Sequence, residues 1–118
     1  MNFMMQKTAF REAFGDSPKV KVIDFLIDNS IGDWSKSDMA EQTGISRATL
    51  NRFFNDLVKQ KMIFKTRIIG RATLYKLNRA LPLIQKLLEL DSILTDNAFE
   101  KEFGKRAPRG KVRVAAVA

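Results

Sequence analysis

Two helix-start signals close together in the middle of the chain place the strongest constraint on its fold. Ser35 and Asp38 form a capping-box pattern, in which each side chain bonds the backbone amide of the other residue at a helix start. Ser46 is a second helix cap, and Gly44 interrupts the chain just before it. The sequence predicts a short helix to Thr43 and a longer helix from Ser46 to about residue 60. A three-residue turn joins them, in which Gly44 can adopt the left-handed conformation that reverses the chain.

Two helices are predicted before this pair. A helix over 5–14 carries Phe10 and Phe14 on one face. The next, over 18–29, follows a Ser17 cap and has a proline at its first position. Spacings of three and four define its inward residues Val20, Ile23, Leu26 and Ile27, and leave Lys19, Lys21, Asp24 and Asp28 pointing outward.

A hairpin and a last helix are predicted after the pair. Met62 to Ile69 and Thr73 to Leu77 are β-prone runs separated by Gly70-Arg71, which predicts a hairpin with a basic tip. Pro82 then opens a helix that we expect to run to about Asp96.

The order of helix, short helix, tight turn, helix and hairpin over residues 17–79 resembles the winged helix-turn-helix family. The positions that carry the resemblance supply a close helix–helix contact, a turn glycine and the core of the second helix, and they are Met39, Ala40, Gly44, Ile45, Leu50 and Phe53. The resemblance implies a mainly α fold with a small β-hairpin (α+β), and a helix that reads DNA. Lys61 departs from it, because many members have a glycine there. Either Lys61 adopts a strained conformation, or the chain leaves the helix by another route.

Four segments follow from this interpretation. Residues 1–16 are a helical extension, 17–79 a winged helix-turn-helix domain, 80–98 a C-terminal dimerisation helix and 99–118 a basic flexible tail.

Charge is concentrated in one segment. Residues 44–79 hold nine basic side chains against Asp56 alone, whereas residues 1–43 hold five basic and seven acidic ones. The two remaining segments, 80–98 and 99–118, have net charges of −2 and +4. A basic segment in the middle of the chain favours a polyanionic partner, although a solvated surface is the alternative interpretation.

The composition leaves little catalytic chemistry. The chain has no cysteine and no histidine, and its thirteen acidic residues form no paired motif. We therefore expect no enzyme activity, no metal site and no cofactor, and metal sensing through Cys and His is excluded. Because neither a secretory signal nor an apolar run of membrane-spanning length is present, we expect a cytoplasmic, nucleoid-associated protein without a membrane partner.

The resemblance implies which residues meet double-stranded DNA. The residues expected at the interface lie on the helix from Ser46 and on the hairpin, and they are Ser46, Arg47, Thr49, Asn51, Arg52, Asn55, Lys59, Arg67 and Arg71. Arginine pairs with guanine, asparagine with adenine and a threonine methyl with thymine, so this helix has suitable base readers. Arg71, at the hairpin tip, is expected at the adjacent minor groove or its phosphates. Trp34 and Tyr75 are expected in the core and not as stacking platforms.

The last helix has an apolar arc too wide for one buried face. We expect a homodimer whose interface comprises Leu83, Ile84, Leu87, Leu88, Leu90 and Leu94. Alternatively, the N-terminal helix covers this surface with Phe10 and Phe14.

The sequence is compatible with three functions. The first is a dimeric, sequence-specific transcription regulator, for which the sequence identifies no small-molecule effector. The second is an architectural protein that coats DNA. The third is a winged helix that binds another protein.

Overall fold

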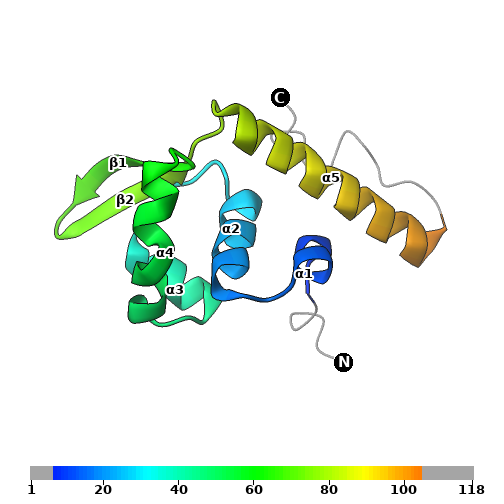
Figure 1. The fold of residues 1–118 in the computed structure, drawn as a ribbon, viewed down its shortest axis with the longest axis horizontal. Helices are drawn as coiled ribbons and strands as arrows, with labels where there is room; N and C mark the ends of the chain where they lie inside the picture. Colours follow the sequence, from blue (N-terminus) through cyan, green and yellow to red (C-terminus); the bar gives the residue numbers. More distant parts are fainter. Residues whose placement is uncertain (1–6, 105–118) are drawn as a thin grey trace.

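Five helices and one β-hairpin make up residues 7–104, the part of the chain that the computed structural model describes (Figure 1). The elements are α1 (Ala9–Phe14), α2 (Pro18–Asp28), α3 (Lys36–Thr43), α4 (Arg47–Lys59), β1 (Ile63–Ile69), β2 (Ala72–Leu77) and α5 (Pro82–Phe103). The expected α+β class, mainly helical with a small hairpin, is therefore confirmed. The expectation of a flexible tail over 105–118 lies outside the described residues.

The helix boundaries depend on side-chain caps. Ser17 accepts a hydrogen bond from the amide of Val20, and Ser35 and Asp38 form the complete capping box. The Ser46 hydroxyl accepts from the amide of Thr49, and Gly44 takes the left-handed conformation at φ 74°. The tight turn between α3 and α4 is therefore built as the sequence predicts.

The core lies where α2, α3 and α4 meet. It contains large apolar side chains that are almost fully buried, among them Val22, Leu26, Ile27, Met39, Leu50, Phe54 and Leu57. Val20 and Ile23 are only half-buried, and Asp24, which was expected to point outward, is buried. That expectation was wrong because Asp24 faces Thr8, the N-cap residue of α1, whose side chain hydrogen-bonds it.

One backbone bridge, together with side-chain hydrogen bonds to Asp33, ties the hairpin to the chain before α3. Trp34 and Tyr75 exchange two backbone hydrogen bonds of 2.7 and 2.8 Å. Both side chains pack against the core, with edge contacts from the Trp34 ring to Phe25 and from the Tyr75 ring to Phe54. Their expected core role is confirmed.

Lys61 joins α4 to β1 and adopts the strained backbone conformation, the first of the two alternatives. Lys61 has φ 62°, and within the described chain it is the one residue other than glycine with a positive φ. Its amide donates to the carbonyl of Val58, and its carbonyl accepts from the Asn78 side chain at 2.9 Å. These bonds hold Lys61 in the left-handed conformation.

Both terminal helices differ from the prediction. α1 begins at Ala9, after a Thr8 cap, and α5 continues past Asp96 to Phe103. Residues 99–103, expected in the tail, are thus helical. The extra turns carry a pair of rings in contact, Phe99 and Phe103, which are tilted by 45° with their centroids 4.6 Å apart.

α1 packs against α5 on the side away from the hairpin (Figure 1). Phe10 is buried, whereas Phe14 is half exposed. Ile84 and Leu88 are fully buried within the chain, so their assignment to a dimer interface was wrong. Packing of α1 on α5, which was the alternative to a dimer, therefore explains part of the wide apolar arc of α5. The outer side of α5 still exposes Leu83, Leu90 and Ile93 at 54, 37 and 55%.

Candidate nucleic-acid interface

One side of α4 is polar and solvent-exposed along its whole length. Its exposed residues include Ala48, Asn51, Arg52, Asn55 and Lys59, and its only acidic residue is Asp56. Four of these five were predicted at the interface. Ala48 was not, because alanine carries no polar group, although its methyl group belongs to the same surface.

Arg47 does not extend along this side. Its Nη1 donates to the Ser37 hydroxyl of α3 at 2.8 Å, so the guanidinium folds back across the turn between the helices. Ser46 and Thr49 are likewise engaged, since the Ser46 hydroxyl donates to Thr49 Oγ1 at 2.9 Å. These three predicted contacts therefore lie at the start of α4, with Thr49 half-buried and committed to the cap.

Asn51 is tied to α3 through Lys36. Lys36 Nζ donates to Asn51 Oδ1 at 3.1 Å and stands 4.6 Å from the centroid of the Phe54 ring. The cation–π contact and the hydrogen bond together hold the ammonium against α4. Lys36 was not among the residues that the sequence predicted at the interface.

Arg67 is already paired with a carboxylate of the protein. Its guanidinium makes two hydrogen bonds to Asp33, at 2.9 and 3.1 Å, and Thr66 donates to the same carboxylate at 2.6 Å. These bonds from Arg67 and Thr66 lower the pKa of Asp33 to about 2, and Asp33 raises the pKa of Arg67. Because its charge is already paired, Arg67 is a weaker candidate for phosphate than Arg71.

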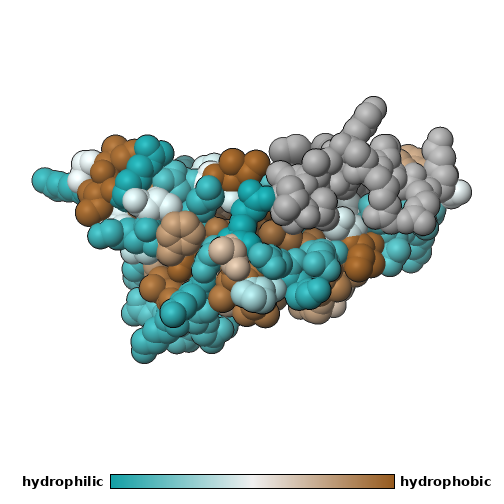
Figure 2. Space-filling view, turned by 90° about the horizontal axis from the view of Figure 1, so that it is seen from above, coloured by the Kyte–Doolittle hydropathy of each residue, from teal (hydrophilic) through white to brown (hydrophobic). Residues whose placement is uncertain are grey.

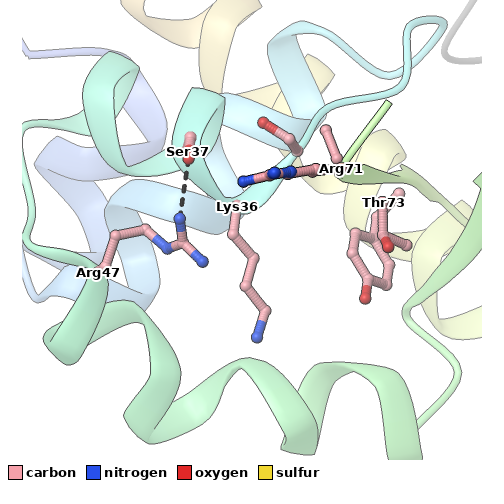
Figure 3. A pocket seen from close by; sticks show the side chains of 8 residues that line it. Lys36, Ser37, Arg47, Arg71 and Thr73 are labelled. Atoms are coloured by element: carbon pink, nitrogen blue, oxygen red, sulfur yellow. Dashed lines mark hydrogen bonds between the residues drawn. The ribbon is translucent and has the colours of Figure 1, made fainter. Parts of the chain in front are cut away.

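A pocket opens between the starts of α3 and α4 and the hairpin (Figure 3). This open depression of about 400 Å³ is lined by Ser35, Lys36, Ser37, Arg47, Arg71, Ala72, Thr73 and Tyr75. Figure 3 shows Arg47 and Arg71 reaching from opposite sides of the view towards Lys36. The structure therefore brings together two arginines that the sequence placed on separate elements. We name this site the α3–hairpin pocket.

Apolar surface borders the polar interface at the hairpin. In the view from above, brown surface lies at the hairpin end of the molecule (Figure 2), where Ile68 and Ile69 are 59 and 55% exposed. Both isoleucines precede the turn at Gly70-Arg71. The hairpin tip thus combines apolar side chains with one cation.

Residues 7–104 contain neither a membrane-spanning helix nor a metal-binding cluster. No helix in this range is long and apolar enough to span a membrane. No group of three acidic side chains in this range is arranged to hold a metal ion. Neither a scan against protein-family models nor a search of curated proteins returns a match for this chain.

Proposed function

We propose that the chain is a winged helix-turn-helix protein that binds double-stranded DNA, with α4 in the major groove and the hairpin as its wing. The observation that carries the proposal is the junction of two surfaces. The exposed side of α4 presents Arg52, Asn55 and Lys59, and the α3–hairpin pocket beside it holds three further cations. Cations of this kind bind phosphates, and arginine and amide groups form hydrogen bonds with base edges.

The proposed readout is sequence-specific. An architectural protein needs backbone contacts alone, whereas α4 exposes two asparagines and an arginine that match base edges. These side chains favour a transcription regulator over a protein that coats DNA. The acid-poor surface also favours DNA over a protein partner.

The proposal includes a homodimer formed through α5. Leu83, Leu90 and Ile93 follow one another at spacings of seven and three, which is the spacing of a coiled-coil seam. Lys86 and Glu89 are exposed on the same helix and carry opposite charges. Such a surface is complementary to itself, so a second copy of the chain is the partner that fits it.

Duplex titrations at several salt concentrations test the proposal. We expect log Kd to rise with log salt with a slope of at least about 2, because each neutralised phosphate contributes roughly 0.9. A selected duplex should bind at least about 10³-fold more tightly than a random one. Lys19→Ala, on the exposed side of α2, is a matched control and should leave both values unchanged.

The outcomes separate the alternatives. A slope shallower than about 2 means that few phosphates are engaged and contradicts DNA binding. A steep slope with a specificity ratio near one supports an architectural protein instead of a regulator.

A further inference from the structure

The α3–hairpin pocket carries positive charge without a matching acid. Lys36, Arg47 and Arg71 line it, and none of its lining residues is acidic. Within residues 7–104 none of these three side chains takes part in a salt bridge, in contrast to Arg67 with its partner Asp33. Three cations that share one depression repel one another unless an anion joins them.

The remaining polar groups of the pocket are able to donate hydrogen bonds. Ser37 Oγ accepts from Arg47, which leaves the hydroxyl hydrogen of Ser37 for another acceptor. Thr73 and Tyr75 add hydroxyl groups from β2. Lys36 uses one of its three N–H donors on Asn51 and keeps two. The pocket therefore offers many donors, as a group with several acceptor oxygens requires.

Among anions with several acceptor oxygens, the two guanidinium groups favour phosphate. A guanidinium presents paired donors in one plane, and this fork fits phosphate oxygens with two parallel hydrogen bonds. Arg47 comes from α4 and Arg71 from the hairpin turn, so an anion between them is held from two elements. The hydrogen bond to Ser37 keeps the Arg47 fork at the pocket.

We propose that the α3–hairpin pocket binds one phosphate group, and that this group is a backbone phosphodiester of the bound duplex. The second part rests on the proposed function. Arg47 is then a phosphate ligand and not a base reader, so sequence readout is left to the exposed side of α4. Arg47 and Arg71, which the sequence suggested would act differently, form the two halves of one clamp.

Titration of the free protein with inorganic phosphate tests the pocket without DNA. The amide signals of Ser37 and Thr73 are followed by NMR at constant ionic strength maintained with sodium chloride. We expect saturable shifts in the wild type, and binding at least roughly tenfold weaker in the Arg47→Ala/Arg71→Ala variant. Lys19→Ala, an exposed cation of α2 outside the pocket, should titrate like the wild type. Equal binding by the wild type and the double variant overturns the proposal.

Duplexes with one neutral methylphosphonate linkage at a time test which phosphate is bound. We expect a position at which the neutral linkage weakens the wild type roughly tenfold but has no further effect on the double variant. If each neutral linkage weakens binding of the double variant as much as it weakens binding of the wild type, the duplex is bound but the pocket holds none of its phosphates. If no duplex binds at all, the proposed function fails, and the phosphate titration alone decides for or against the site.

Discussion

At the scale of single residues, Lys36 determines how Asn51 is presented. An ammonium group only donates, so the Asn51 oxygen must face Lys36 and its NH₂ group is directed elsewhere. Pairing with adenine, which the sequence suggested, requires both the oxygen and the NH₂ group. With its oxygen engaged, Asn51 offers donors, which suit the acceptors of guanine or thymine.

Asn51→Asp tests this orientation. The carboxylate keeps an acceptor for Lys36 but removes the donors, so we expect discrimination of about 1 to 3 kcal/mol to be lost at one base position. Relative affinities for duplexes carrying each of the four bases at that position measure it. Lys36→Met should release the amide oxygen and move the preference towards adenine. Unchanged preferences in both variants would show that Asn51 reads no base.

Asp24 is a second residue whose environment sets its chemistry. Burial, reinforced by the charges of Asp28 and Asp91, raises its pKa to about 6, while the Thr8 hydroxyl and Arg11 oppose the shift. In the described chain its Oδ1 is buried without a hydrogen-bond partner. The folded protein therefore holds the proton of Asp24 more tightly than the unfolded chain does.

Asp24→Asn should stabilise the protein at neutral pH. A folded pKa above the unfolded value of 3.8 gives stability that is present below pH 4 and lost as the pH rises through 6. Each pKa unit corresponds to about 1.4 kcal/mol, and because Asp24 borders a solvent-open depression we expect a gain of about 1 to 2 kcal/mol at pH 7. Urea unfolding at pH 4 and pH 7 measures it, with Asp56→Asn as an exposed control. A gain of equal size at both pH values would contradict the proposed cause.

At the scale of elements, local signals predict starts and turns better than ends. The caps at Ser17, Ser35 and Ser46 act within four residues, so the sequence contains all that they need. The end of α5 is different, because residues 97–103 contain no breaker and the helix continues to Gly104, at φ 74°. The apolar periodicity weakens after residue 94, and only Phe99 and Phe103, four residues apart and in contact, continue it.

The junction of α4 and β1 is strained, and this can be measured. Lys61→Gly relieves a left-handed conformation that costs a side chain about 1 kcal/mol, and we expect a net gain of up to about 1 kcal/mol in unfolding free energy. The same change at Lys86, inside α5, should instead cost about 1 kcal/mol. Thermal unfolding of both variants compares them. A loss at Lys61 would show that its side chain contributes more than the strain costs.

At the scale of the whole molecule, the sequence does not predict which distant segments come together. Arg47 and Arg71 reach one pocket because the bridge of Trp34 to Tyr75 sets the hairpin beside α3, and no local pattern indicates that pairing. The wide apolar arc of α5 is predictable from spacing. The side of α5 that α1 covers is not predictable in this way, because burial of Ile84 and Leu88 depends on tertiary packing.

The proposed dimer can now be tested on the residues that remain exposed. Ile93→Glu places a charge in the seam without touching the core, so we expect a folded monomer and weaker duplex binding. Analytical ultracentrifugation at tens of micromolar, with circular dichroism for folding, measures the change. Glu89→Gln, at the border of the seam, should remain dimeric. A wild type that sediments as a monomer would contradict the dimer while leaving DNA binding open.

The irregularity in β1 has a consequence for solubility. Thr66 is an extra residue between Lys65 and Arg67 in the pairing with β2, and its hydroxyl is held by Asp33 and by the carbonyl of Leu74. Within the described chain β1 is the outer strand, and it exposes Ile68 and Ile69. A regular apolar edge of this kind invites strands of other molecules to add to it, whereas a bulge flanked by two cations interrupts the row of hydrogen-bonding groups. The bulge thus protects the exposed hairpin from edge-to-edge aggregation.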